Sequence, residues 1–316
     1  MKRRDFLAAG GALALSSALP ARAAFPEKPV RYFIAFAPGG ESDIAARLQQ
    51  PFFRKKFGQE LVIDSKPGAG GALAWSQLNG MPGDGYTVMG TNLPHIVLQP
   101  LEGNVQYKTE DITNIHFFQY TPDAIIVRTE SPFRTFQDLV AAAKAEPGKL
   151  NFAGSGTNSA NHAAHERLNN LAGIKTQYVA FKGTGDLVGA LLGGHVDGAM
   201  SYSPLALTQK GKTRMLAVAS EKRLDFFPEV PTFRELGHEW VDGAIRGIAV
   251  PKSTPEDLRR RLSDMFSEIN RDPDFRKQML DLGFELMDVT YDKMPAFMEE
   301  RKKAYLSAAK LMGLAK

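Results

Sequence analysis

The sequence predicts an α/β protein of two lobes, and three observations lead to this fold class. Short apolar runs alternate with longer amphipathic stretches, which is the pattern of a mainly parallel sheet covered by helices. The alternation restarts around residues 121–123, so the chain carries two such sets of strands and helices. Its 316 residues suffice for two domains of about 150 residues each.

The N-terminus has the three parts of an export signal. A basic start, Lys2-Arg3-Arg4, precedes an uncharged run from Ala8 to Pro20 and the small-residue pattern Ala21-Arg22-Ala23, which predicts cleavage after Ala23. The arginine pair also resembles the twin-arginine pattern of folded cargo, so both export routes stay open. An uncleaved membrane anchor is the alternative, but the run is shorter than the roughly 20 apolar residues that span a bilayer.

The first predicted strand, Val30 to Ala37, runs through a glycine-rich loop into a helix that begins near Ser42. Ile44, Leu48 and Phe52 recur four residues apart on one face of that helix, and Gly58 is placed to end it. Two further strands of this set are predicted at Glu60–Asp64 and Tyr86–Thr91.

The second set starts with a short strand, Ile125 to Val127. Thr135 and Asp138 then resemble a capping box that opens a helix, which Pro147-Gly148 closes. The other elements predicted here are strands at Leu150–Ala153, Gln177–Phe181, Val196–Tyr202 and Arg214–Ala219 and a helix at Ser159–Leu171.

Two helices are predicted near the C-terminus. Thr254 as cap and Pro255 at the first helical position start the first one. Its buried stripe is Leu258, Leu262, Met265 and Ile269. The last helix runs from about Met294 to Leu311.

Composition excludes several classes of function. The chain has 39 basic and 35 acidic residues, and four of the basic ones lie in the predicted leader, so the mature protein is nearly neutral and offers no case for nucleic-acid binding. It has no cysteine, which excludes disulfides and thiolate metal ligands. No apolar run after the leader approaches bilayer length.

Two loops at strand ends are the candidates for ligand binding. Pro38 to Ser42 and Gly154 to Asn158 each follow a predicted strand and open a helix, and one lies in each lobe. In open α/β sheets ligands bind beyond the carboxyl ends of strands, where helix N-termini present free N–H groups and a partial positive charge of about half a unit. Two such loops facing each other predict a cleft for a carboxylate or dicarboxylate. The alternative is that both are only tight strand-to-helix turns.

Other motifs fit their chemistry less well. Gly68-Ala69-Gly70-Gly71 lacks the last glycine of a dinucleotide fingerprint, because Leu73 stands there. Ser155 lacks the outer glycines of a nucleophile elbow, which argues against a serine hydrolase. His162 and His165 share a helix but have no third metal ligand in sight, so His162 is expected to assist an anion site instead. Asp43 and Arg47 are spaced for a salt bridge.

Several motifs, in order along the chain, resemble the Bug family, the substrate-binding proteins of tripartite tricarboxylate transporters. Pro38 to Arg47 is very similar to the first-helix signature of that family, and Lys66 to Gly71 and Pro82 to Thr87 are similar to its next two motifs. The resemblance continues through the second lobe in four segments, Phe181-Lys182-Gly183, Leu191 to Asp197, Leu216 to Ala219 and Pro228 to Glu235.

The resemblance implies a hinged periplasmic binding protein of type II-like fold whose two lobes are joined by two crossing strands. It would close over a small carboxylate and present it to a permease of two integral membrane subunits, without catalysis or cofactor. We expect a monomer. The predicted ligand-binding residues are Pro38, Gly39, Gly40, Ser42, Asp43, Gly154, Ser155, Gly156, Thr157, Asn158, His162, Phe181, Lys182 and Gly183.

Two departures from the family bear on the ligand. Phe181 stands where the family usually has tyrosine, which makes the cleft more apolar, and Arg246 lies where it often has tryptophan. We hypothesise that Arg246 or Lys182 pairs with a second acidic group of the ligand. An aliphatic dicarboxylate, an amino acid and an aromatic acid all stay open, as does a solute sensor that signals to a membrane kinase.

The lobe boundaries follow from where the pattern restarts and returns. Residues 1–23 form the leader, 24–122 the first part of lobe one, 123–241 lobe two, and 242–316 complete lobe one. Two crossing strands predict a hinge that allows rigid-body closure.

Overall fold

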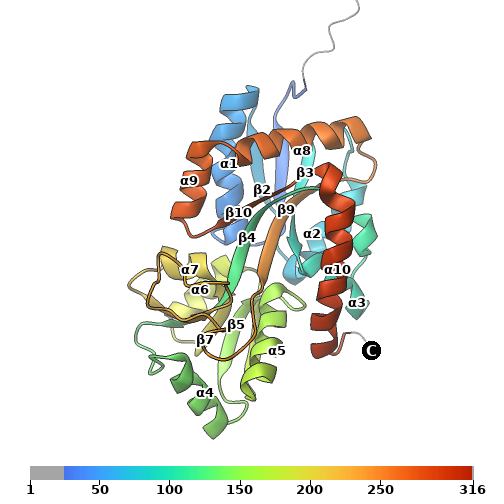
Figure 1. Cartoon of the computed structure of the whole chain (residues 1–316). Helices are drawn as coiled ribbons and strands as arrows, with labels where there is room; N and C mark the ends of the chain where they lie inside the picture. The colour runs from blue at the N-terminus through green and yellow to red at the C-terminus, as the bar shows by residue number, and fades with distance from the viewer. Residues whose placement is uncertain (1–24, 315–316) are drawn as a thin grey trace, which may run out of the picture.

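The computed structural model describes residues 25–314. The predicted leader lies outside these residues. Within them no helix is both long and apolar enough to cross a membrane. The fold is α/β with two lobes, drawn one above the other in Figure 1.

The first lobe is built on a mixed sheet in the order β2-β1-β3-β9-β4, with β10 on the far side of β4. Strand β1 runs parallel to β2 and β3, while β9 and β10 are antiparallel to their neighbours. The strands are β1 Val30–Ile34, β2 Leu61–Ser65, β3 Thr87–Leu93, β4 Thr113–Arg128, β9 Gly243–Val250 and β10 Glu285–Val289.

The second lobe carries the sheet β4-β7-β5-β6, with β8 also paired to β4. Strand β5 is parallel to β6 and β7, and β4 is antiparallel to β7 and β8. Its further strands are β5 Asn151–Ser155, β6 Gln177–Phe181, β7 Gly198–Tyr202 and β8 Thr213–Val218.

Strand β4 belongs to both lobes, and its partners change at one point. Residues 113–122 pair with β9 of the first lobe, whereas 123–128 pair with β7 and β8 of the second. The chain returns beside this point, because the Asp123 N–H donates to the Asp242 carbonyl (3.0 Å) just before β9 begins. Strands β4 and β9 therefore run side by side between the lobes (Figure 1). The predicted boundaries near residues 122 and 241 remain a prediction of which parts of the chain move as rigid units.

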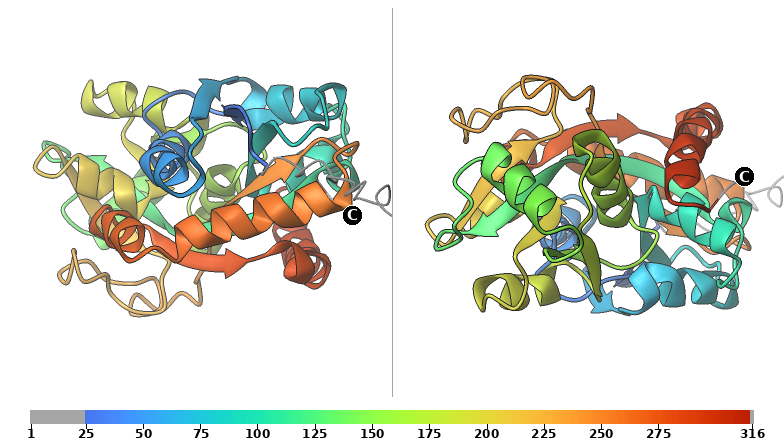
Figure 2. Two further views of the ribbon diagram at one scale, coloured as in Figure 1. Left: turned by 90° about the horizontal axis from the view of Figure 1, so that it is seen from above. Right: turned by 90° about the horizontal axis from the view of Figure 1, so that it is seen from below.

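Helices flank the strands of both lobes, as the end-on views of Figure 2 show. In the first lobe α1, α8 and α9 pack together, and α10 packs against both α3 of the first lobe and α5 of the second. The helices are α1 Glu41–Phe57, α2 Ala72–Gln77, α3 His95–Glu102, α4 Phe136–Ala145, α5 Ala160–Ala172, α6 Thr184–Leu192, α7 Ser203–Thr208, α8 Glu256–Asn270, α9 Pro273–Asp281 and α10 Met294–Leu311.

The apolar periodicities of the sequence explain how these helices bury their faces. Phe52 of α1 is buried, and Gly58 ends the helix in the left-handed conformation (φ 69°) that glycine favours. In α8, Leu262, Met265 and Ile269 are fully buried in the same core. The capping box of α4 is present, with the Asp138 N–H donating to the Thr135 hydroxyl (3.2 Å).

Two local predictions were wrong. The sheets are mixed, not mainly parallel, because the strands that cross between the lobes run against their neighbours. Thr254 does not cap α8: the cap position is Pro255, and the buried Thr254 hydroxyl has no hydrogen-bond partner within residues 25–314. Strand β4 makes the hydrogen-bonded path continuous from one lobe to the other.

Candidate functional site

The two predicted loops meet in a small cavity between the lobes. Gly40 and Ser42 line it from the first lobe, and Ser155 and Thr184 line it from the second. Its volume is about 10 Å³, room for roughly one water molecule. The full lining is Phe36, Gly40, Glu41, Ser42, Asn92, His95, Ser155, Thr184, Tyr202 and Arg246.

The lobes touch each other through two glycines. Gly185, in the first turn of α6, lies so close to the carbonyl of Pro38 that an added Cβ atom would overlap it. At the second contact a Cβ atom on Gly156 would overlap the backbone of Gly70. No larger residue fits at either glycine while the lobes keep this arrangement.

Three helices point their N-termini at the cavity. Glu41, His95 and Thr184 are the first residues of α1, α3 and α6, and each lines it. The cap residues before these helices make no side-chain hydrogen bond to the first turn. Since the first N–H groups of a helix have no partner within it, three partial positive charges converge on this space.

A buried guanidinium adds a full positive charge. Arg246 comes from β9, is 3% exposed, and donates from Nη1 to the Thr121 hydroxyl. Its guanidinium carbon lies 4.8 Å from the centre of the Tyr202 ring. Its Nη2 lies 3.6 Å from Oε2 of Glu41, which is also buried. Arg246 is thus a wall of the cavity, as the hypothesis that it contacts the ligand requires.

His95 stands beside this cation as a neutral ring. Burial, and then the charge of Arg246, lower the pKa of His95 to about 3. Neither ring nitrogen has a hydrogen-bond partner among the described residues, and the ring packs edge-on against Phe36 at 5.6 Å and Trp75 at 6.1 Å. An uncharged polar ring is therefore available in the wall.

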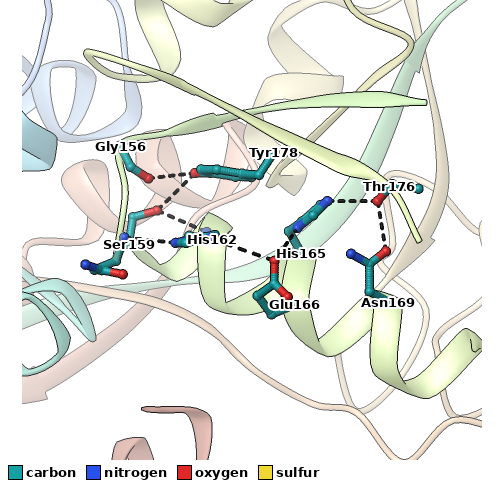
Figure 3. A network of polar contacts seen from close by, with 9 residues as sticks. Gly156, Ser159, His162, His165, Glu166, Asn169, Thr176 and Tyr178 are labelled. Carbon is teal, nitrogen blue, oxygen red and sulfur yellow. Dashed lines mark hydrogen bonds and ion pairs between the residues drawn. The ribbon is translucent and has the colours of Figure 1, made fainter. Parts of the chain in front are cut away.

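The second-lobe loop is held in place by the start of α5 and by β6 (Figure 3). The hydroxyl of Tyr178 donates to the Gly156 carbonyl at 2.7 Å and lies 3.3 Å from the Ser159 hydroxyl. His162 stacks on the Tyr178 ring (4.5 Å), and its Nδ1 accepts from the Asn158 N–H at 3.1 Å. These contacts fix a loop in which Asn158 has a positive φ of 49°.

The network continues away from the cavity. His165 lies 3.0 Å from Glu166 through Nδ1 and 2.8 Å from the Thr176 hydroxyl through Nε2, and Thr176 donates to Asn169 (Figure 3). Burial lowers the pKa of both His162 and His165. The two histidines therefore brace α5 against β6, and no group of three metal-binding side chains forms in residues 25–314.

The structure brings some predicted residues to the cavity and leaves others around it. Gly40, Ser42 and Ser155 line it, and Gly183 packs directly behind Phe36 and Ala37. The following predicted residues lie outside the lining: Pro38 and Gly39 at the exposed loop tip, Asp43, Gly154, Gly156, exposed Thr157, Asn158, His162, half-buried Phe181 and exposed Lys182.

Two of these outer residues have clear local roles. Asp43 bonds to Arg47 (2.9 Å), as its spacing predicts, and also accepts from the Gly39 N–H at 3.0 Å, so it shapes the loop. Asn158 donates across the gap to Glu102 at the end of α3. Both support the cavity from outside it.

Sequence reasoning missed five residues of the lining, Phe36, Asn92, His95, Thr184 and Tyr202. Glu41 lies within the predicted loop but was not among the predicted ligand-binding residues. Asn92 and Tyr202 lie at the ends of β3 and β7, and His95 and Thr184 open helices. The rule that selected the two glycine loops, a strand end followed by a helix, would have found these as well.

Comparison with known proteins gives similar chains over almost the whole length. The family described as "Tripartite tricarboxylate transporter family receptor" matches residues 45–312. The UPF0065 protein in the gbd 5′ region of Cupriavidus necator is 31% identical over 326 residues, which cover 100% of this chain and 99% of that protein.

Two solved structures are similar as well. That of the periplasmic binding protein BugD has a TM-score of 0.83 at 27% identity, covering 90% of this chain and 98% of its own. MatC from Rhodopseudomonas palustris, solved with bound malate, has a TM-score of 0.81 at 27% identity, covering 90% of this chain and 100% of its own.

Proposed function

The chain belongs to the tripartite tricarboxylate transporter receptor family, and from this premise we propose that it captures a small carboxylate between its two lobes and delivers it to a membrane transporter. Malate bound to the related MatC supports a small carboxylate as ligand. Export of the chain by its N-terminal segment, with cleavage after Ala23, would place this activity in the periplasm.

The observation that carries this proposal is the buried Arg246 facing three helix N-termini. A carboxylate in the cavity meets a planar guanidinium and several N–H donors at once, and these charge-assisted hydrogen bonds are strong where water is excluded. The binding residues we propose are those of the two loops, the start of α6, and Arg246.

Binding requires the lobes to part. A cavity of about 10 Å³ is far smaller than a dicarboxylate, and the lobes touch each other at Gly185 and Gly156. We assign the hinge to the two crossing segments at 122–123 and 242–243, where the strand partners change. Opening exposes the helix N-termini, and closing removes the ligand from water.

Calorimetry on the protein purified after expression of the full-length chain tests this proposal. We expect saturable binding of at least one small carboxylate and no turnover. At a thousand times its dissociation constant such a ligand adds about 4 kcal/mol to stability, which a thermal shift detects. A folded protein that binds none of several dozen carboxylates contradicts the proposal. Mass spectrometry of the exported protein tests cleavage after Ala23.

A further inference from the structure

Glu41 places a negative charge in a cavity otherwise suited to anions. Its side chain is 5% exposed and lines the same space as Arg246, whose side chain is 4% exposed. Their closest nitrogen and oxygen are 3.6 Å apart, longer than the roughly 2.7–2.9 Å of a charge-assisted hydrogen bond. The two groups are neighbours without being a tight pair.

Each group also keeps an unused atom. Oε1 of Glu41 and Nε of Arg246 are buried, and neither has a hydrogen-bond partner among the described residues. Buried polar atoms are almost always paired, so these two atoms of residues that line one cavity call for a partner, which is a water molecule in the closed cavity or a ligand group that replaces it. That partner must accept from Arg246 and donate to Glu41.

The other titratable groups near the cavity are engaged, or their shifted pKa favours the neutral form. Burial raises the pKa of Asp123, whose carboxyl interacts with the charge of Arg246, well above its usual range. Asp43 is bonded to Arg47 and to the Gly39 N–H. His95 is neutral over the ordinary pH range, since its pKa is lowered to about 3. The charges of Arg246 and Glu41 therefore cancel, and the space between them is bipolar with no net charge.

We infer that the ligand is zwitterionic, an α-amino acid whose carboxylate binds Arg246 and the helix N-termini and whose ammonium group donates to Glu41. This inference rests on the proposed function and narrows its ligand class. A plain dicarboxylate would bring a second negative charge toward Glu41, and a plain monocarboxylate would leave Oε1 of Glu41 unpaired in a dry site.

The competing explanation is that Glu41 only neutralises Arg246. In that case the carboxylate has no contact with the ligand, and an ammonium group contributes nothing to affinity. Matched ligands with and without that group separate the two explanations, because they differ in nothing else.

The experiment is calorimetry on the full chain with the twenty standard amino acids and their des-amino counterparts, such as alanine with propionate, aspartate with succinate and glutamate with glutarate. We expect at least one amino acid to bind roughly 30-fold or more tighter than its des-amino partner, as for a buried charge contact. N-acetylation of that amino acid should abolish the preference. The wild-type protein alone suffices for both measurements.

A variant of Glu41 then tests whether its carboxylate causes the preference for the amino acid over the des-amino acid. Glu41→Gln should remove most of the preference for the amino acid while leaving the affinity for the des-amino acid equal or higher. Glu229→Gln, which changes an exposed glutamate, is the matched control and should alter neither affinity.

Three results would overturn the inference. The first is a des-amino acid that binds as tightly as its amino acid, and the second is a Glu41→Gln variant that keeps the preference for the amino acid. Both overturn the inference and leave the proposed function intact. If neither ligand class binds the folded protein, the proposed function fails, and the inference fails with it.

Discussion

Gly185 of the second lobe lies directly against the Pro38 carbonyl of the first, with no room between them for a single added carbon. The contact joins the first turn of α6 to the loop before α1. Because this contact crosses the gap between the lobes, no larger side chain fits at residue 185 while the lobes keep this arrangement.

Gly185→Ala should weaken ligand binding without weakening the fold. Alanine stabilises a helix by about 1 kcal/mol relative to glycine, yet its Cβ atom blocks closure. Calorimetry should show about tenfold or more lower affinity, and small-angle scattering a larger radius of gyration. Gly189→Ala in the same helix meets nothing within 4 Å and should leave both unchanged. Equal affinity in the two variants would exclude the contact as a limit on closure.

Arg246→Met should destabilise the protein by about 3–5 kcal/mol, because it leaves Glu41 buried without its cation. The double variant Glu41→Gln/Arg246→Met should recover most of this loss but bind no carboxylate. Urea unfolding followed by tryptophan fluorescence measures the stability of the single and of the double variant, since Trp75 is buried in the first-lobe core and Trp240 in the second-lobe core. Equal stability of the single and double variants would show that the two groups are not coupled.

His95→Phe should make the protein less sensitive to acid. The folded pKa of His95 is about 3, so between pH 6.5 and 3 the unfolded chain binds a proton that the folded chain does not. Stability from this group is complete above pH 6.5 and is lost as the pH falls, by about 1.4 kcal/mol per unit. As the pH falls from 6.5 to 3, the unfolding free energy of the wild type should drop relative to that of the variant with this slope. Parallel curves would contradict the prediction.

Tyr178→Phe should loosen the second-lobe loop. Removing the hydroxyl leaves the Gly156 carbonyl without its 2.7 Å donor, which costs about 1–3 kcal/mol. Ligand affinity should fall as well, since the loop ends at the cavity. Tyr86→Phe removes a hydroxyl that bonds only near the surface, to the Glu27 N–H, and should cost less than about 0.5 kcal/mol. An effect no larger than this control would count against the bracing role of Tyr178.

The sequence predicts eight of the ten strands and five of the ten α-helices within residues 25–314, because their apolar periodicity is local. Strands β9 and β10 and the helices α2, α3, α6, α7 and α9 are not predicted. Of the long strand β4 only Ile125 to Val127 is predicted. Its earlier half carries His116, Gln119 and Thr121, which are polar yet fully buried. Their burial comes from β9, β10 and α8, elements far away along the chain, so no local pattern reveals it.

The site was predictable only in part for the same reason. The glycine loops carry a signal within five residues, and Gly40, Ser42 and Ser155 reach the cavity as expected. Comparison with a family pattern singles out Arg246, whereas Glu41 lies inside the first predicted loop without a role of its own, and its place in the first turn of α1 is one where acids are common. Only the pairing of β9 with β3 and the packing of α1 bring these two charges together.

The second lobe enters and leaves the first at neighbouring residues, since the Asp123 amide bonds to the Asp242 carbonyl. The second lobe is an insertion between two neighbouring strands of the first-lobe sheet, β4 and β9, and the two ends of the insertion lie next to each other. In the proposed opening the second lobe rotates about these two ends, and we expect the exchange rate of one amide hydrogen, that of Asp123, to report that motion.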